Sequence, residues 1–449
     1  MHNDGPPATD RGSRRVRSRR QVLALLGGTA SVALTGGTLP ADESPTVDHP
    51  AAVRVDEPIE LTVRGVPAGS ELEVVLDGEY MTGETFGAAV TVEAETPTLS
   101  LNEAPIVGGD VPAGLDVPTT GALIQFADIP WAAYAGAAGD PARWPPETSL
   151  TYHVVADDRP IGALTLSRWH PVTNVVEPAG DLVGRVFEPS SGGSGPGVLV
   201  LHGADGTPQE HVAALLARHG FTAFALEYVS GPALSEAVVE VPMAYVKAAI
   251  DWLRDRERVA GDRIGVWGVG RGGELGLFAG SLYDGVGAVV SVGGSGVLWE
   301  GGAVRGPPAG TAAWAVDDSS RSYLSVATGE SADRPTRYAE ALAAAGELEA
   351  ETATIPVERI DGPVLLVSGD DDEVWPSARL HALAADRLEA RDHPSFEHLR
   401  YADAGRQILQ PYLPLRGTAG PEYGGTLAGN AEAAHAHWPR VLGTLSTLT

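Results

Sequence analysis

The spacing of apolar residues divides the chain into two parts with different periodicities. In the first part, from about Val53 to Leu166, short runs alternate apolar and polar residues, namely 59–63, 72–76, 90–92, 150–155 and 163–166. Alternation with a period of two is typical of strands with one buried face. Asp77–Gly78 is a turn signal that predicts the end of the second run. We therefore expect an all-β sandwich domain over residues 42–167, with the Gly-, Pro- and Ala-rich segment 105–146 left unassigned.

In the second part, apolar runs without alternation are separated by helix-like segments. The predicted strands are 183–189, 198–201, 221–226, 264–267, 288–292 and 363–367, and the predicted helices are 210–219, 237–256, the segment after Gly270, and 378–389. Strands that are apolar throughout and alternate with helices form a mostly parallel sheet with helices on both faces. We expect one such domain over residues 183–449, with its site at the carboxyl ends of the strands, and a linker over 168–182.

The first 41 residues differ from the rest in composition. A polar, arginine-rich segment ends in Arg19–Arg20, and a modest apolar run, 22–34, follows it. Twin arginines before such a run are typical of a signal for the twin-arginine export pathway, whereas a disordered basic tail is the alternative. The run is too short to cross about 30 Å of hydrocarbon. We therefore predict export to the cell surface or exterior over residues 1–41, without an integral membrane span.

Composition excludes several classes of partner and site. The formal net charge is −28 and Lys247 is the only lysine. This charge repels nucleic acid, and diffuse acidity suits a protein from a high-salt environment. The absence of cysteine excludes disulfides, thiolate metal sites and a cysteine nucleophile. The histidines show no paired spacing with carboxylates, so we expect neither a metal nor a cofactor.

The most informative stretch runs from Asp262 to Phe278. A strand-like run ends in the glycine-dense turn Gly268–Val269–Gly270–Arg271–Gly272, and a helix-like run follows. This is the outline of the nucleophile elbow, G-x-S-x-G, of α/β-hydrolases. Gly270 stands where the nucleophilic serine belongs, and glycine has no side chain that could attack a substrate. No G-x-S-x-G occurs elsewhere in the chain.

Taken together, the motifs resemble the acyl-CoA thioesterase / bile acid-CoA:amino acid N-acyltransferase family. The stretches that carry the resemblance are 197–203, 239–242, 272–275, 371–372 with 375–377, 411–414, and 424–426 with Asn430, Ala433 and Trp438–Pro439. The resemblance implies an N-terminal β-sandwich followed by an α/β-hydrolase domain. It also implies a catalytic series in the order nucleophile, aspartate, histidine.

Position by position, the resemblance assigns the nucleophile to Gly270 and the histidine to Arg406. It assigns the acid to Asp372, with Asp371 as the second choice. A guanidinium stays protonated and cannot act as a general base at ordinary pH, so two of the three catalytic groups are missing. We expect Arg406 to pair bidentately with Asp372 or Asp371, because a guanidinium can take the acidic partner that the histidine would have had.

The binding groups of the old site are also assigned by the resemblance. The oxyanion loop corresponds to Gly203, Ala204 and Asp205. An Asp205 carboxylate facing the pocket would oppose charge on a substrate oxygen, whereas an aspartate in a turn would face solvent. The amide of Arg271, at a helix N-terminus, could still bind an anion.

Two functions remain open at this stage. The first is a catalytically degenerate, exported member of the family that binds an acyl ligand or a partner through the old cleft. The alternative is an active thioesterase, carboxylic ester hydrolase or acyltransferase that uses other groups. The candidate substitutes are Ser291, Ser295, His202, His393 and His398, for which a packing or surface role is the favoured interpretation. Ser281 is expected about three turns along the helix, on the wrong part of it for catalysis. The sequence leaves the oligomeric state open.

Overall fold

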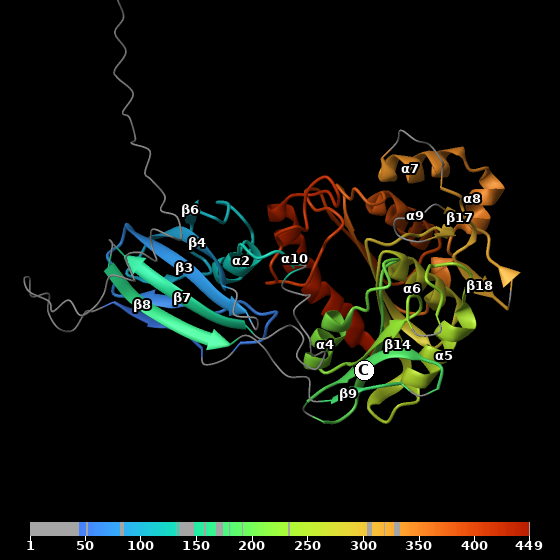
Figure 1. Cartoon of the computed structure of the whole chain (residues 1–449), viewed down its shortest axis with the longest axis horizontal. Coiled ribbons are helices and arrows are strands. Elements are labelled where there is room, and N and C mark those ends of the chain that lie inside the picture. Colours follow the sequence, from blue (N-terminus) through green and yellow to red (C-terminus); the bar gives the residue numbers. More distant parts are fainter. Residues whose placement is uncertain are drawn as a thin grey trace, which may run out of the picture.

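The computed structural model describes residues 45–50, 53–80, 85–131, 133, 148–156, 159–167, 174–178, 180–190, 192–231, 234–302, 308–317, 319–326 and 333–448. The predicted export signal, 1–41, lies outside these residues, as do 168–173 and 179 of the predicted linker. Figure 1 shows a β-rich part formed by the first third of the chain beside an α/β part formed by the rest. No helix among the described residues has the length and apolarity needed to cross a membrane.

The N-terminal part contains two antiparallel sheets, as a sandwich requires. The smaller sheet has the order β1 (Thr46–Asp48), β2 (Thr62–Arg64), β5 (Thr98–Ser100). The larger has the order β6 (Ile106–Gly109), β4 (Thr85–Ala94), β3 (Ser70–Tyr80), β7 (Thr148–Ala156), β8 (Arg159–Ser167). The helix α2 (Thr119–Gln125), which the sequence pattern did not reveal, is buried beside them.

The predicted turn at Asp77–Gly78 is wrong. Both residues lie inside β3, where they pair with β4 on one side and β7 on the other. A Cβ atom on Gly78 would overlap the ring of Phe86, its cross-strand partner. The glycine therefore provides room for an aromatic side chain that packs over the strand.

The α/β part is built on one twisted sheet, which confirms the predicted α/β-hydrolase fold class. Its order is β21 (Phe396–Tyr401), β20 (Val364–Gly369), β15 (Val286–Val292), β14 (Val259–Val269), β11 (Gly195–Leu201), β12 (Thr222–Glu227), β10 (Val183–Glu188), β9 (Asn174–Val176). Strands from β21 to β12 are parallel, and β10 and β9 are antiparallel additions.

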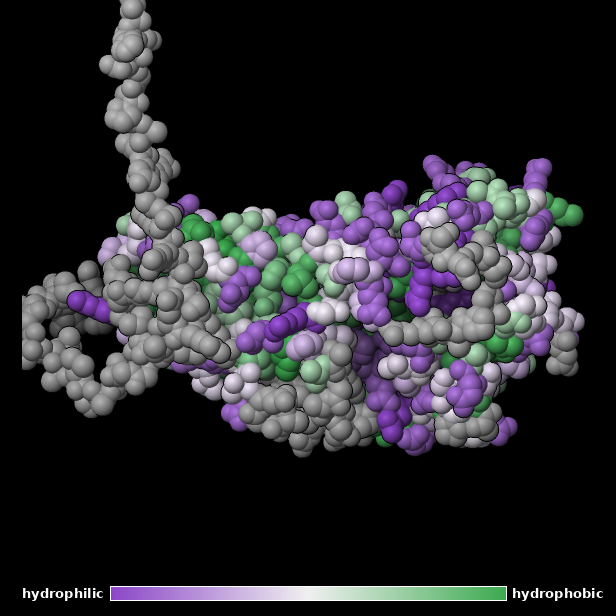
Figure 2. All heavy atoms as spheres, turned by 45° about the horizontal axis from the view of Figure 1, so that its top comes forward, coloured by the Kyte–Doolittle hydropathy of each residue, from purple (hydrophilic) through white to green (hydrophobic). Residues whose placement is uncertain are grey.

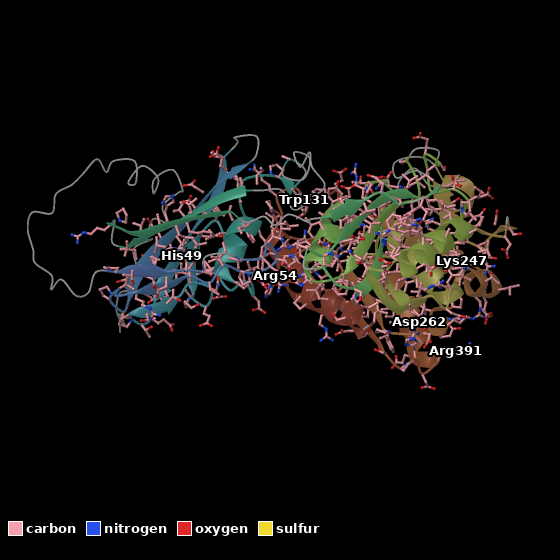
Figure 3. All side chains as sticks on the ribbon, turned by 90° about the horizontal axis from the view of Figure 1, so that it is seen from below. His49, Arg54, Trp131, Lys247, Asp262 and Arg391 are labelled. Atoms are coloured by element: carbon pink, nitrogen blue, oxygen red, sulfur yellow. The ribbon has the colours of Figure 1, made fainter. Side chains whose placement is uncertain are left out.

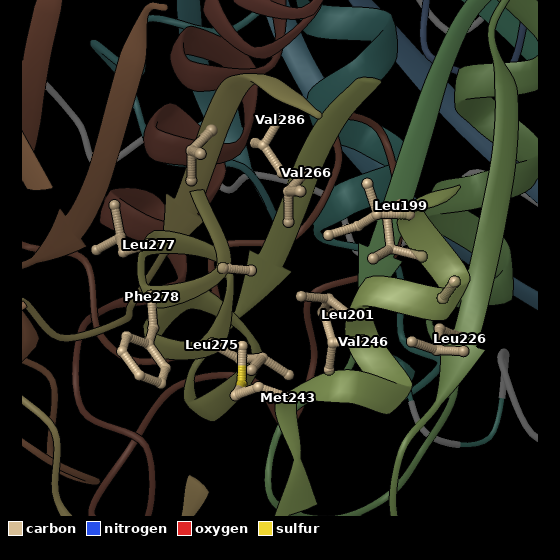
Figure 4. Close-up of a cluster of buried hydrophobic side chains, with 14 of the residues drawn as sticks. Leu199, Leu201, Leu226, Met243, Val246, Val266, Leu275, Leu277, Phe278 and Val286 are labelled. Atoms are coloured by element: carbon tan, nitrogen blue, oxygen red, sulfur yellow. The ribbon is translucent and has the colours of Figure 1, made fainter. Parts of the chain in front are cut away.

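Helices cover both faces of this sheet because consecutive strand residues point to opposite sides. Leu199 and Leu201 pack in one buried cluster with α5 (Met243–Arg254), α6 (Arg271–Leu282) and α9 (Ser377–Ala390), part of which Figure 4 shows. Val198 and Val200 pack on the other face with α4 (Glu210–Arg218) and α10 (Leu427–Leu445). The strand is therefore apolar throughout, as its sequence predicted.

The predicted helix over 237–256 begins later than expected. It starts at Met243, while Val241–Pro242 forms the short strand β13 and Glu240 has a positive φ of 48°. A proline cannot donate an intrahelical hydrogen bond, and it keeps the residue before it out of the helical region, so the helix cannot extend back through Pro242.

Several smaller elements complete the α/β part. They are β16 (Glu300–Gly302), β17 (Pro308–Ala312), β18 (Trp314–Val316), β19 (Ser319–Ser320), α7 (Arg334–Ala344), α8 (Glu347–Ala353) and the 3-10 turns Val357–Arg359 and Ser446–Leu448. The strand β13 pairs with β18, which pairs with β19.

The two parts share a core. The buried cluster of the N-terminal sheets also contains Leu409, Tyr412, Leu413, Leu415 and Ala431 from the end of the chain. Trp131 lies at the junction in Figure 3, where its backbone N–H donates to Arg416 O at 3.0 Å.

A polar contact adds to this junction. Buried Asp56 accepts hydrogen bonds from His219, at the end of α4, and from Trp438 Nε1 of α10, the latter at 2.8 Å. An aspartate from the N-terminal part is thus held by both helices on one face of the α/β sheet.

Candidate functional site

The nucleophile elbow is present as a backbone feature. Gly270 follows β14 and precedes α6, with φ 59° and ψ −118°. A Cβ atom on Gly268 would overlap Gly272 O, and one on Gly272 would overlap His202 O. These glycines are therefore required by the close approach of the turn to the end of β11, as the G-x-S-x-G pattern implies.

The guanidinium of Arg406 occupies the space above Gly270. A Cβ atom on Gly270 would overlap Nη2 of Arg406, and all three atoms nearest to it belong to that side chain. The Nη1 atom donates to Gly293 O at 2.5 Å and lies 3.4 Å from Asp372 Oδ2. The guanidinium carbon is also 5.5 Å from the ring centre of Trp375. The arginine thus stands where a nucleophile would project.

The predicted pair between Arg406 and Asp372 is confirmed, but its geometry is not the bidentate one we expected. One nitrogen, Nη1, serves both Asp372 and the carbonyl of Gly293, and the carbonyl takes the shorter bond. The arginine side chain is 15% exposed and the aspartate side chain 1%. The pair therefore lies at the floor of the site, with the carboxylate behind the guanidinium.

The two candidate acids differ in their surroundings. Asp372 Oδ1 accepts from the backbone N–H groups of Val374 and Trp375 at 2.9 and 3.3 Å, which aims Oδ2 at Arg406. Asp371 is exposed, and its Oδ2 accepts from Gly425 N at 2.7 Å. Only Asp372 occupies a position from which it could orient a base at residue 406.

The oxyanion loop follows β11 as predicted by position. Gly203 O accepts from Gly206 N at 3.3 Å, which closes a turn that contains Ala204 and Asp205. Asp205 is exposed. Its carboxylate therefore belongs to a solvent-facing turn. The carboxylate also lies close to Gly203, because a Cβ atom built on that glycine would be 3.2 Å from Oδ1 of Asp205.

His202, a possible stand-in base, is engaged at both ring nitrogens. Nδ1 lies 2.6 Å from Gly203 O, and Nε2 accepts from Tyr228 N at 3.2 Å. Its ring stacks on Tyr228 at 4.0 Å. Burial lowers the pKa of His202, so the imidazole is neutral and serves the structure of the loop.

Arg271 offers the site its amide but not its guanidinium. Its side chain is buried, where Nη1 donates to Glu274 Oε2 at 2.7 Å and Nη2 donates to the carbonyls of Trp299 and Glu300 at 3.1 Å. Burial raises the pKa of Glu274 to about 7, against the opposing charge of Arg271. The amide N–H of Arg271, in the first turn of α6, has no acceptor within the helix.

A serine and a histidine do meet, but beneath the elbow. Ser291 Oγ lies 2.9 Å from His381 Nε2, and His381 Nδ1 lies 2.7 Å from Ser368 Oγ, which in turn contacts His398 Nε2 at 3.1 Å. Ser291, His381 and Ser368 are fully buried. A Cβ atom on Gly273 would be 2.5 Å from Ser291 Oγ, so the backbone of α6 covers the hydroxyl.

Sequence reasoning missed His381 and Ser368 in this chain. Neither stands in a recognisable motif, and only the packing of α9 on β20 and β15 brings them to Ser291. Burial lowers the pKa of His381 well below its usual value. The four side chains therefore form a hydrogen-bonded network in which Ser291, His381 and Ser368 are fully buried and His398 is half-buried.

The other named substitutes also have structural partners. Ser281 donates to Phe278 O at 2.8 Å, Ser295 donates to Val297 O at 2.8 Å, and His393 Nε2 lies 2.8 Å from Ile360 O. Within the part of the chain that the structure describes, no three His, Cys, Asp or Glu side chains form a group that could hold a metal ion.

Several known proteins are similar to this chain. The family described as "BAAT / Acyl-CoA thioester hydrolase C terminal" matches residues 241–447. Human acyl-coenzyme A thioesterase 1 is 29% identical over 372 residues, which cover 80% of this chain and 84% of that protein. Residues 241–447 thus match this family, and the similarity to acyl-CoA thioesterases extends over 80% of the chain. The chain carries Gly270 and Arg406 at the positions that the sequence resemblance assigned to the nucleophile and the histidine.

A second curated protein and a solved structure are also similar to the chain. Human mitochondrial acyl-coenzyme A thioesterase 2 is 28% identical over 380 residues, 80% of this chain and 73% of that protein. Among solved structures, a dienelactone hydrolase-like promiscuous phosphotriesterase from metagenomic libraries is 18% identical, with a TM-score of 0.39 over 61% of this chain and 97% of that one.

Proposed function

We propose that this relative of the acyl-CoA thioesterase/BAAT family does not catalyse acyl transfer and instead binds a ligand through the cleft of the old active site. The observation that carries the proposal is the overlap between Arg406 Nη2 and the place where a side chain of residue 270 would begin. The position of the nucleophile is thus both without a side chain and filled by a cation.

The chemistry of acyl transfer supports this proposal. A serine attacks only when a base takes its proton, and a guanidinium cannot accept one at ordinary pH. The remaining acid, Asp372, faces a permanent cation instead of an imidazole. Its role is then to neutralise Arg406, a structural role in place of the orientation of a base.

The export predicted from residues 1–41 is consistent with a binding function. Coenzyme A thioesters are intracellular metabolites, so an exported protein would not meet the substrates that its relatives are named for. In this proposal the protein acts at the cell surface or outside the cell, where it binds a small acyl compound. Fold and family alone do not fix the function, because one scaffold hosts many activities.

One observation favours a second candidate, an active thioesterase or esterase. Ser291 and His381 form a hydroxyl–imidazole contact of 2.9 Å, the kind of pair that nucleophilic catalysis uses. An opening of the covering helix turn at Gly273 would be needed to expose it.

A hydrolysis assay separates the two candidates. The full-length protein, purified in high salt, is incubated with short and long acyl thioesters and with aryl esters. The binding proposal predicts no turnover above the uncatalysed rate. Turnover that disappears in Ser291→Ala but persists in Ser281→Ala would instead establish the second candidate, because both hydroxyls are buried and only that of Ser291 contacts a histidine.

A further inference from the structure

Among the described residues, the guanidinium of Arg406 donates hydrogen bonds through Nη1 alone. Nη1 is engaged by Gly293 O and Asp372 Oδ2. Among the described residues, Nε and Nη2 have no hydrogen-bond partner, and Nη2 lies over Gly270 at the floor of the old site. A guanidinium edge that carries two parallel donors is thus left available in the cleft.

The same edge binds carboxylates elsewhere in this chain. Nε and Nη2 of Arg387 donate to the two oxygens of Glu358 at 2.5 and 2.7 Å. Nε and Nη2 of Arg400 donate to the two oxygens of Asp370 at 3.0 and 3.1 Å. The spacing of the two donors matches the two oxygens of a planar carboxylate. The Nε and Nη2 groups of Arg406 therefore have the spacing needed to bind both oxygens of a carboxylate.

The local charge selects the kind of anion. Asp372, which is almost fully buried, stands behind Arg406 and offsets its charge, and exposed Asp205 lies at the oxyanion loop. A dianion would meet repulsion from both carboxylates, whereas a monoanion adds one charge beside a cation and the first turn of α6. A neutral ester or thioester carbonyl gains much less from a guanidinium than a carboxylate does.

The surroundings of Arg406 favour an apolar body on this anion. Its guanidinium lies over Trp375, and the ring of Tyr338 packs edge-on against Trp375 at 5.6 Å. Tyr338 is only half-buried, and its ring also packs edge-on against Trp299 at 4.7 Å. The apolar contact is thus assigned to these aromatic rings alone, because the face of the α/β part drawn in Figure 2 is hollowed among hydrophilic side chains.

We propose that the cleft binds a free monocarboxylic acid with an apolar body, whose carboxylate is held by Nε and Nη2 of Arg406. The ligand is thus an acid of the kind that a thioesterase releases, and not the thioester itself. This inference rests on the proposed binding function and names its ligand class. The substitution of Arg406 for a base converts a site for a reacting carbonyl into a site for a charged head group.

Calorimetric titration of the full-length protein at one fixed, high ionic strength tests the ligand class. The probes are octanoate, its neutral isostere octanamide, and inorganic phosphate. Octanoate is expected to bind roughly 10- to 100-fold more tightly than octanamide, because hydrogen bonds to charged groups are worth that factor, and phosphate is expected not to compete. Equal affinity for octanoate and octanamide, or displacement of octanoate by phosphate, would overturn the inference.

Two variants locate the head group. Arg406→Gln is expected to lose the preference for octanoate over octanamide, and Arg406→Lys to retain only part of it, because lysine keeps the charge without the fork. Arg400→Gln is the matched control, since it removes the same kind of carboxylate-binding edge from the surface of β21. An unchanged preference in Arg406→Gln would overturn the assignment to this residue.

The experiments test this ligand class separately from the proposed binding function on which it rests. Thioester turnover by the wild-type protein would contradict the binding function, whatever the titrations show. If the protein shows no turnover and binds octanoate and octanamide equally well, the binding function would stand, but the inference that the ligand is a carboxylate would be wrong. If Arg406→Gln fails to give a cooperative thermal melt, the wild-type titrations and Arg406→Lys decide the question.

Discussion

Gly270 and Arg406 should be energetically coupled, and a double-mutant cycle with Gly270→Ser and Arg406→His measures the coupling. The backbone of Gly270 has φ 59° and ψ −118°, a conformation that costs a side-chain-bearing residue about 1–3 kcal/mol. A Cβ atom there would overlap Arg406 Nη2, so Gly270→Ser must also displace the guanidinium.

The displacement has a calculable cost. Moving Arg406 breaks its bond to Gly293 O and leaves Asp372, whose side chain is 1% exposed, without its cation. Breaking one half of a buried pair costs roughly 3–5 kcal/mol, and the 15% exposure of Arg406 places this case near the lower end. Gly270→Ser alone should therefore lower the free energy of unfolding by roughly 4 kcal/mol or more.

In the Arg406→His background the overlap is absent, and only the backbone term of about 1–3 kcal/mol remains. The two substitutions should then couple by about 2 kcal/mol or more. Denaturant unfolding of the four proteins at one salt concentration provides the free energies. Additivity to within about 0.5 kcal/mol would refute the placement of Arg406 over Gly270, because sites without contact behave in that way.

The same four proteins provide a functional readout. The double variant alone restores a hydroxyl, an imidazole and Asp372 in the order that the family resemblance implies. Its thioester hydrolysis is expected to exceed that of the wild-type protein by at least about 10²-fold, the lower range for a positioned general base. Either single variant should remain at the wild-type level.

Two further predictions concern buried polar contacts. Burial by itself raises the pKa of Asp56, but the hydrogen bonds from His219 and Trp438, the charge of His219 and a backbone hydrogen bond together outweigh it, so the pKa lies below its usual 3.8. Asp56→Asn should therefore lower the free energy of unfolding by roughly 3 kcal/mol near neutral pH, a difference that shrinks as the pH falls below 3.8. Ser291→Ala should cost about 1–3 kcal/mol in denaturant unfolding, because it leaves His381 Nε2 without its partner.

Each of these predictions has an internal reference. For Asp56, a difference between wild type and Asp56→Asn that stays constant from neutral pH to below pH 3.8 would contradict the pairing with His219. For Ser291, the reference is Ser281→Ala, because the hydroxyl of Ser281, among the described residues, bonds to Phe278 O within its own helix. If Ser291→Ala and Ser281→Ala lower the free energy of unfolding equally, the hydrogen-bond network around His381 makes no specific contribution to stability.

Much of the α/β part could be predicted because its strands are buried on both faces. A run such as Val198–Leu201 is apolar at every position for that reason, and the pattern is visible without any tertiary information. The pairing of Arg406 with Asp372 was also predictable, since the resemblance assigned these two residues to neighbouring catalytic positions. The fold and the family resemblance are accordingly the parts of the sequence prediction that are confirmed.

The remaining features depend on contacts between distant segments. Asp77–Gly78 has the local signature of a turn, and only the ring of Phe86 across the sheet explains a glycine inside β3. Nothing near Gly270 indicates that a guanidinium from Arg406 fills the space above it. His381 stands in no motif, because it lies on α9 whereas its partners Ser291 and Ser368 lie on β15 and β20.

The shared core at the junction has a consequence for the order in which the chain can fold. Leu409, Leu413 and Ala431 complete the apolar cluster of the N-terminal sheets. During synthesis, one side of those sheets stays uncovered until the residues from 409 to 431 have left the ribosome. A fragment ending before residue 409 would keep that side exposed to water, and we expect it to associate with itself or to be degraded.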